Sequence, residues 1–395
     1  MSTENVCPVC SSTDVSVFFE VSDVPAHVGL QWSSRDAARH CSKGDIKLAF
    51  CNACGFIANL AFEPARLEYM QAYENALHFS PHFQGYAQSV ATRLIERYNL
   101  YNKDIIEIGC GKGDFLLLLC ELGKNRGVGF DKSYSGEHTD SAVTEQITFI
   151  RDFYSERYAS YQGDLICCRQ VFEHIDNPTD FLTMLRRTIG NRLNTVVYFE
   201  VPNVLFILRD LSVWDIIYEH CSYFSLGSLA RVFTLCGFDI LDLAETYDGQ
   251  YLDIEAKPRN GSSNSGHDSW DDLKAMADYV TVFADNYRTR LEMWRCHLKR
   301  IEDAGQRVVV WGAGARGVSF LNMLKIEDQI KYVVDINPRK QGLYMAGTGQ
   351  QIVSPESLRD HPPDVVIVMN PIYKTEIQQL MERLGLTAEF LCASG

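Results

Sequence analysis

Short apolar runs alternate with amphipathic stretches over about residues 87–258. Residues 104–108, 127–130 and 164–168 have the length and composition of buried strands, and apolar residues recur at helical spacing between them. Strands that alternate with helices are typical of a parallel sheet covered by helices. We therefore predict an α/β core domain in this part of the chain.

A long helix is predicted to follow the core. Between residues 271 and 302, apolar residues recur every three or four positions, which indicates a helix with one buried face. The residues of this face are Leu273, Met276, Val280, Phe283, Tyr287, Leu291 and Trp294. Residues 307–311 and 364–368 then have the pattern of buried strands, so a second, smaller α/β domain is expected at the C-terminus.

The length of 395 residues exceeds what one core usually organises, and the polar stretch at residues 260–266 has the composition of a linker. We predict an N-terminal module at residues 1–65, the α/β core at 66–258, a linker and connecting helix at 259–302, and a Rossmann-like domain at 303–395.

Composition and charge exclude several classes of protein. Hydrophobic residues make up 46% of the chain without any apolar run near twenty residues, which argues against disorder and against a membrane span. The net charge of −14 makes nucleic acid a poor partner. The N-terminus lacks a secretory signal, so we expect a cytoplasmic protein, monomeric or homodimeric, that acts on a small molecule.

Two pairs of cysteines bracket one loop of the N-terminal module. Cys7 and Cys10 form the first pair, and Cys51 and Cys54 form the second. Four thiolates in this spacing suit a tetrahedral Zn²⁺ ion, and a complete set of sulfur ligands indicates a structural site. Unrelated buried cysteines and a redox disulfide are the alternatives.

The strand at residues 104–108 leads into a glycine-rich turn and then into a helix. Gly109 and Gly111 let the backbone approach a ligand closely, as in dinucleotide-binding turns. Glu107, at the strand end, would suit the methionine ammonium of S-adenosylmethionine and would repel a pyrophosphate. We therefore predict S-adenosylmethionine as the cofactor.

Further cofactor contacts are predicted at the ends of the next strands. Asp131 follows a strand about twenty residues after the turn, where an acid can accept bonds from both ribose hydroxyls. Asp152 either accepts from the adenine amine or is a solvated loop residue. Gln170 ends another buried strand, and Glu173 and His174 after it either line the cleft or cap the following helix.

The chain resembles the three-domain sugar C-methyltransferases that act on deoxysugar nucleotides. The resemblance rests on the doubled cysteine pairs, the turn at residues 107–114 and the motif at residues 218–224, in that order along the chain. It implies a zinc-binding module at residues 1–65, a class I methyltransferase core with a Rossmann-like sheet at 66–258, and a second Rossmann-like domain at 303–395 that helps to bind a sugar nucleotide.

The resemblance also implies catalytic residues. They are Tyr218, Glu219 and His220, joined by Tyr73 and His78 from the segment after the zinc module. The characterised sugar enzymes have a histidine between the tyrosine and the glutamate, and this chain lacks it, which places it on a separate branch. Removing a proton beside a ketone requires a base near neutrality, and His220 meets this need, while the two tyrosines could donate to the enolate oxygen.

Two alternative functions remain open at this point. The first is an O- or N-methyltransferase on the same scaffold, in which His220 removes a proton from the acceptor heteroatom. The second uses the glycine turn at residues 312–317 and Asp335, which match a dinucleotide fingerprint, and would make the protein an NAD(P)-dependent oxidoreductase or a nucleotide-binding module.

Overall fold

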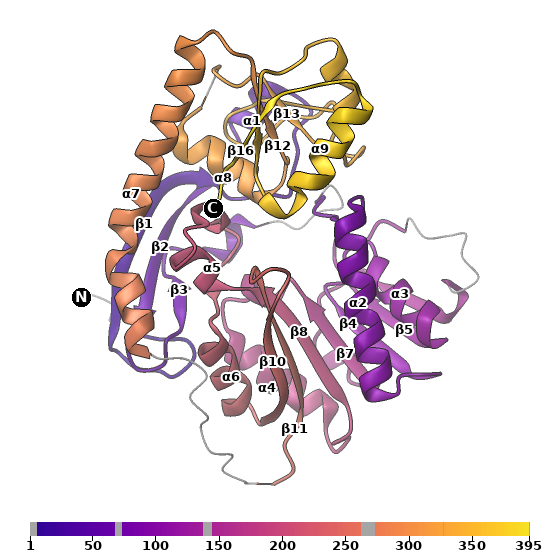
Figure 1. The fold of residues 1–395 in the computed structure, drawn as a ribbon. Coiled ribbons are helices and arrows are strands. Elements are labelled where there is room, and N and C mark those ends of the chain that lie inside the picture. Colours follow the sequence, from indigo (N-terminus) through magenta and orange to yellow (C-terminus); the bar gives the residue numbers. More distant parts are fainter. Residues whose placement is uncertain (1–5, 68–72, 137–143, 262–272, 327, 395) are drawn as a thin grey trace.

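The protein is described here from a computed structural model that covers residues 6–67, 73–136, 144–261, 273–326 and 328–394. The strands of these residues form three sheets, which we call the N-terminal, core and C-terminal sheets (Figure 1). Residues 262–272, within the segment predicted as linker and helix, lie outside the described residues.

The N-terminal sheet is antiparallel and has a strand order of β1-β2-β3-β9. Its strands are β1 (Val15–Pro25), β2 (Lys43–Cys51), β3 (Ile57–Asn59) and β9 (Ser222–Tyr223). A short helix, α1 (Arg35–Arg39), connects β1 to β2. Strand β9 belongs to the core segment in sequence but pairs with β3, so the sheet fixes the chain directly after His220.

The core sheet has the order β10-β11-β8-β7-β4-β5-β6. The strands are β4 (Asp104–Ile108), β5 (Arg126–Phe130), β6 (Ile147–Ile150), β7 (Leu165–Arg169), β8 (Val196–Pro202), β10 (Phe238–Thr246) and β11 (Tyr251–Pro258). Strands β4 to β8 are parallel, whereas β11 runs antiparallel to both β8 and β10. The chain proceeds outward in both directions from β4, which creates a switch point between β4 and β7 where ligands commonly bind.

Helices cover both faces of this sheet. They are α2 (Pro81–Tyr98), α3 (Asp114–Gly123), α4 (Pro178–Ile189) and α6 (Leu226–Leu235), whereas α5 (Val204–Leu208) packs against α7 (Leu273–Asp303). Alternate strand residues face opposite sides, so that Ile105 packs with α2 and α3 while Ile106 packs with α4 and α6. Two-sided burial explains why the strands read as continuous apolar runs.

The C-terminal sheet is parallel and has the order β14-β13-β12-β15-β16. Its elements are β12 (Val308–Trp311), α8 (Ala315–Leu324), β13 (Tyr332–Val334), β14 (Gln351–Val353), β15 (Val365–Val368), α9 (Lys374–Arg383) and β16 (Glu389–Cys392). The predicted α/β class with a second Rossmann-like unit is therefore confirmed.

The long helix α7 (Leu273–Asp303) joins the units and lies beside β1 and α8 (Figure 1). Six of the seven apolar residues of its predicted face are buried, from Met276 to Trp294, and Leu273 is half-buried. No described helix is long and apolar enough to cross a membrane.

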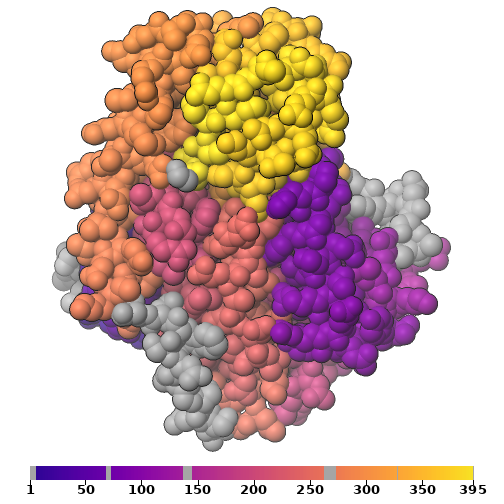
Figure 2. Space-filling model, in the orientation of Figure 1, coloured from indigo at the N-terminus to yellow at the C-terminus, as the bar shows by residue number. Residues whose placement is uncertain are grey.

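The C-terminal unit also meets the core at the beginning of α2. Figure 2 shows its surface, in yellow, against the purple surface of this helix. Ser80 caps α2 through a bond from the Phe83 amide, and its hydroxyl donates to Glu376 of α9 at 2.7 Å. The contact encloses the space between the two α/β units.

We predict that Phe233→Ala destabilises the core by about 3–5 kcal/mol, because the side chain is fully buried among Phe172, Phe199 and Phe238. The matched control is Leu235→Ala on the same helix, where the side chain is 56% exposed and the change should stay within about 0.5 kcal/mol. Urea unfolding followed by circular dichroism measures both, and equal shifts for the two variants would contradict the packing described.

Candidate active site

The strand-turn-helix unit predicted around Gly109 is present at the switch point of the core sheet. Strand β4 ends at Ile108, the glycines at 109, 111 and 113 have φ values of 70°, 56° and 94°, and α3 begins at Asp114. The amide of Gly111 donates to the Asp131 carboxylate at 2.8 Å, which fixes the turn. A side chain at position 111 would project into open space, so the turn leaves room for a ligand.

A cavity of about 1040 Å³ lies over this turn. Glu107, Asp131, Asp152, Arg169 and Gln170 line it together with the glycine turn, so the predicted cofactor residues are brought together. Glu107 Oε2 is buried and has no hydrogen-bond partner among the described residues. Burial raises the pKa of Glu107 to about 8, although Arg169 opposes this shift.

The other predicted cofactor residues already make contacts within the protein. One oxygen of Asp131 holds Gly111, and the other accepts from both the amide and the hydroxyl of Ser133. Asp152 accepts from the Tyr158 hydroxyl at 2.5 Å and pairs with Arg157. Gln170 has a φ of 54°, a strained value for a residue other than glycine, and its side-chain amide donates to Glu200.

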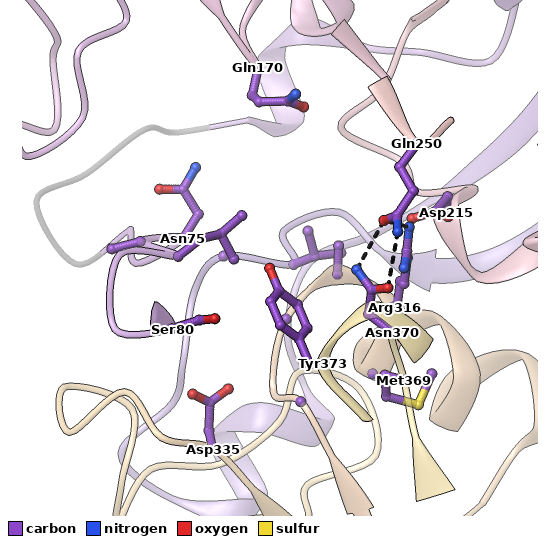
Figure 3. A pocket seen from close by; sticks show the side chains of 18 of the residues that line it. Asn75, Ser80, Gln170, Asp215, Gln250, Arg316, Asp335, Met369, Asn370 and Tyr373 are labelled. Atoms are coloured by element: carbon purple, nitrogen blue, oxygen red, sulfur yellow. Dashed lines mark hydrogen bonds and ion pairs between the residues drawn. The ribbon is translucent and has the colours of Figure 1, made fainter. Parts of the chain in front are cut away.

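A second cavity of about 340 Å³ lies between the core and the C-terminal unit (Figure 3). Arg316 donates to Asp215 at 2.6 Å and to Gln250 at 2.9 Å, and the side-chain amides of Gln250 and Asn370 donate to each other. Gln250 thus links the two units across the cavity wall. Tyr373 donates no bond to this group and instead accepts one from Tyr247.

The two cavities share part of their walls. The residues that line both are Tyr73, Asn75, Ala76, Leu77, Gln170 and His174. A molecule in the larger cavity and a molecule in the smaller one would therefore meet beside Gln170 and His174. This arrangement suits the transfer of a group between two ligands.

His220 lines the smaller cavity close to this junction. Its Nε2 lies 4.0 Å from Glu173 Oε1, and the Nε2 of His174 lies 3.9 Å from the same oxygen. Burial, with a smaller contribution from His174, lowers the pKa of His220 well below its usual value. The imidazole is therefore neutral near pH 7.

Glu219 is fully buried and holds other parts of the site in place. Its carboxylate accepts from the Val28 amide at 2.7 Å and from the Tyr73 hydroxyl at 2.5 Å, and it lies 3.7 Å from His27 Nδ1. Burial raises the pKa of Glu219, but these polar neighbours outweigh burial and hold it below its usual value. The carboxyl group that lies near the His220 ring is therefore that of Glu173, whereas the carboxylate of Glu219 faces Tyr73.

The structure does not bring Tyr218 and His78 to the junction. Tyr218 is fully buried, its hydroxyl accepts from the Glu63 amide at 2.9 Å, and it lines neither of the two cavities. His78 lines the larger cavity, where its Nδ1 lies 3.0 Å from Asp114.

Two residues at the junction were not singled out as catalytic from the sequence. Glu173 and His174 lie in a short 3-10 helix, Phe172–His174, directly after β7 and Gln170. The alternative that they cap the next helix is wrong, because Asn177 caps α4 by accepting from the Asp180 amide. Their position shortly after a buried strand, at the edge of the sheet where ligands bind, was the feature of the sequence that could have indicated a catalytic role.

The paired cysteines of the N-terminal module form one cluster. Cys7 Sγ lies 3.5 Å from Cys54 Sγ, and Cys10 Sγ lies 3.6 Å from Cys51 Sγ. All four sulfur atoms lie within 4.8 Å of one another. Gly55, with a φ of 74°, forms the turn after the second pair.

The second glycine turn lines the smaller cavity. Asp335 accepts from the amides of Ala313 and Asn337, each at 2.8 Å, so its carboxylate stabilises the turn in the way that Asp131 stabilises the first. In both α/β units, an aspartate after the second strand thus accepts a hydrogen bond from a backbone amide of the glycine turn.

Comparison with known proteins agrees with this architecture. Residues 83–243 match the methyltransferase domain family, and residues 269–392 match the C-methyltransferase C-terminal domain family. The C-methyltransferase NovU of Streptomyces niveus is 27% identical over 299 residues, which cover 72% of this chain and 70% of that protein.

Solved structures of methyltransferases align with less than half of the chain. Magnesium protoporphyrin IX methyltransferase from Synechocystis PCC 6803, with bound S-adenosylhomocysteine, is 18% identical with a TM-score of 0.36, over 45% of this chain and 84% of that one. Human N-acetylserotonin methyltransferase, in complex with S-adenosylmethionine, is 15% identical with a TM-score of 0.35, over 45% of this chain and 55% of that one.

The fold, the glycine turn and the family matches together define an S-adenosylmethionine-dependent methyltransferase of class I fold. The chain carries both a methyltransferase domain and a C-methyltransferase C-terminal domain, and it is related to the C-methyltransferase NovU.

Proposed function

We propose that the protein methylates a carbon atom of a nucleotide-linked keto-deoxysugar, with S-adenosylmethionine as the methyl donor and His220 as the general base. The observation that carries this proposal is the shared wall of the two cavities, where His174 and Gln170 separate the donor side from the acceptor side. His220 lines the acceptor side of that wall.

The larger cavity fits the cofactor. Its glycine turn leaves open space at position 111, and the unpartnered oxygen of Glu107 suits a ligand ammonium group. Asp131 and Asp152 would face the ribose and the adenine, and Gln170 would lie near the methyl group. When bound, S-adenosylmethionine supplies an electrophilic methyl group on a sulfonium centre.

The smaller cavity supports an acceptor with a carbonyl group and polar substituents. His220 is neutral and can take a proton from the carbon beside the carbonyl. Tyr73 is held by Glu219, so this pair would position the wall beside the acceptor. Arg316 and Asn370, from the C-terminal unit, offer polar contacts for the nucleotide part of the acceptor.

An O- or N-methyltransferase is the second candidate, because a neutral His220 could also remove a proton from a hydroxyl or amine. The two reactions give products that NMR distinguishes, because a methyl group bonded to oxygen or nitrogen has different proton and carbon chemical shifts from one bonded to carbon. The C-methyltransferase relative favours attack by carbon.

We predict that S-adenosylhomocysteine binding releases close to one proton at pH 7. The pKa of about 8 keeps Glu107 mostly protonated before binding, and a ligand ammonium beside it would lower that pKa and expel the proton. Calorimetry in buffers with different ionisation enthalpies measures the release. Glu107→Gln should abolish the release and weaken binding by about 10–100-fold. Wild-type binding without proton release would rule out this role.

We predict that His220→Ala lowers kcat by about 10²–10⁴-fold while the affinity for S-adenosylhomocysteine stays nearly unchanged. A panel of nucleotide-linked keto-deoxysugars with S-adenosylmethionine provides the assay. His361→Ala is the control, because His361 stacks on Tyr332 in the C-terminal unit and lines neither cavity. Full activity of His220→Ala would remove its role as the base.

We also propose that the four clustered cysteines bind a structural Zn²⁺ ion. Four thiolates around a tetrahedral zinc would have sulfur separations of about 3.8 Å, and the observed separations of 3.5 and 3.6 Å are close to this value. A cytoplasmic location, which we propose as well, would keep the thiols reduced.

We predict that Cys7→Ser releases the zinc and exposes residues 6–67 to proteolysis, because the metal ties the ends of the N-terminal loop together. The metal content is measured by plasma mass spectrometry. Cys296→Ser is the matched control, since Cys296 is exposed on α7, and this variant should retain its zinc. An unchanged metal content in Cys7→Ser would exclude the site.

A further inference from the structure

Glu173 is a buried carboxyl group that the packing of the protein leaves incompletely bonded. Its side chain is 2% exposed, and Oε2 has no hydrogen-bond partner among the described residues. Burial of a polar group without a hydrogen-bond partner is unfavourable. The carboxyl group lines the smaller cavity, so a ligand in that cavity could supply the missing bond.

Glu173 lies beside the two histidines of the junction. Glu173 Oε1 lies 3.9 Å from His174 Nε2 and 4.0 Å from His220 Nε2, and the three groups lie within 4.8 Å of one another. Nδ1 of His174 donates to the Glu219 carbonyl, so Nε2 of the neutral ring carries no proton, and His220 is the proposed base. Glu173 is therefore the member of this cluster that could donate to an oxygen of the acceptor.

The unpartnered oxygen of Glu173 favours a hydrogen bond to the acceptor. Oε2 is buried beside the proposed base His220, and Glu173 lines the smaller cavity, so an oxygen of the acceptor could complete its bonds.

We propose that Glu173 is a further catalytic residue, which donates a hydrogen bond from its carboxylic acid group to the carbonyl oxygen of the acceptor. This inference rests on the proposed C-methylation with His220 as base. It assigns the stabilisation of the enolate oxygen to Glu173, whereas the sequence pointed to Tyr218 and Tyr73.

The protonation state of Glu173 agrees with this role. Burial raises its pKa to about 8, a backbone hydrogen bond lowers it, and repulsion from Glu200 of β8 raises it further. Burial also lowers the pKa values of His174 and His220, so neither is a cation that would favour the carboxylate. Further ionisable groups near this cluster are Cys168 of β7, Glu219 and Cys221 of the loop before β9, and Tyr223 of β9.

The step is balanced in atoms and charge. The C–H bond beside the carbonyl breaks, the proton passes to His220, and the electron pair moves toward the oxygen that Glu173 holds. The carbon then forms a bond to the methyl group as the S–C bond breaks, and the sulfur leaves neutral. Glu173 keeps its proton throughout, and the His220 imidazolium returns its proton to water.

The proposal also gives a reason for attack by carbon. An oxygen that accepts a hydrogen bond from a carboxylic acid becomes a weaker nucleophile, while the enolate carbon remains reactive. Glu173 would therefore direct the methyl group to carbon and away from oxygen.

Two substitutions test the hydrogen bond with a nucleotide-linked keto-deoxysugar that the wild type methylates. Glu173→Ala should lower kcat by about 10²–10³-fold with little change in KM, because the donor is lost. Glu173→Gln keeps a donor of the same shape, so kcat should stay within about tenfold of the wild type. A kcat of Glu173→Ala equal to that of the wild type, or equal losses in both variants, would overturn the proposal.

The pH profile separates this role from a structural one. A carboxyl group that must be protonated loses its function as the pH rises through its pKa, so wild-type kcat should fall above about pH 8. Glu173→Gln cannot lose this proton and should lack the fall. If the fall of kcat at high pH persists unchanged in Glu173→Gln, another group causes it, and this role of Glu173 is excluded.

An infrared measurement tests Glu173 independently of the acceptor. The difference spectrum of wild type and Glu173→Gln, with S-adenosylhomocysteine and no acceptor, should contain the carbonyl stretch of a protonated carboxyl group at pH 7. The absence of this band would overturn the proposal even if sugars are methylated. If the band is present and no keto sugar is methylated, the proposed function fails while the protonated carboxyl group stands.

Discussion

The cost of burying a carboxyl group without a partner is the constraint on which this site depends. Among the described residues, the carboxyl oxygens that are buried and unpartnered belong to Glu107 and Glu173, and each lines one of the two adjoining cavities. A folded chain tolerates such groups where a ligand completes their bonds. Glu107 would meet the ammonium of the cofactor, and Glu173 would meet the oxygen of the acceptor.

All three sheets contribute to the position of these groups. Strand β9 anchors the residues after His220 to the N-terminal sheet, and Glu219 ties Tyr73 to the same region. Glu74 accepts from Asn337 at 3.0 Å, and Ser80 donates to Glu376, so the segment between them is fixed to the C-terminal unit. The acceptor cavity therefore exists only when the N-terminal module, the core and the C-terminal unit are packed together.

The fold could be predicted from the sequence because the spacing of apolar residues along the chain indicates which side of each strand or helix is buried. The continuous apolar strands, the glycine turn and the apolar face of α7 each depend on residues that are close in sequence. The orientation of the motif at residues 218–220 could not be predicted in this way. The loop before β9 has neither helical nor strand periodicity, so its sequence does not indicate which way each side chain points. In the fold, Tyr218 faces the Glu63 amide and His220 faces Glu173. Glu173 was missed as a catalytic residue because its importance comes from an unpaired oxygen, which only tertiary packing reveals.

The most direct test of this account is a crystal structure with S-adenosylhomocysteine and a nucleotide-linked keto-deoxysugar bound together. The account predicts the ligand ammonium within hydrogen-bond distance of Glu107 and the sugar carbonyl oxygen within hydrogen-bond distance of Glu173, with the carbon beside the carbonyl facing His220. An adenosyl group bound over the glycine turn at residues 312–314, or a carbonyl oxygen away from Glu173, would contradict it.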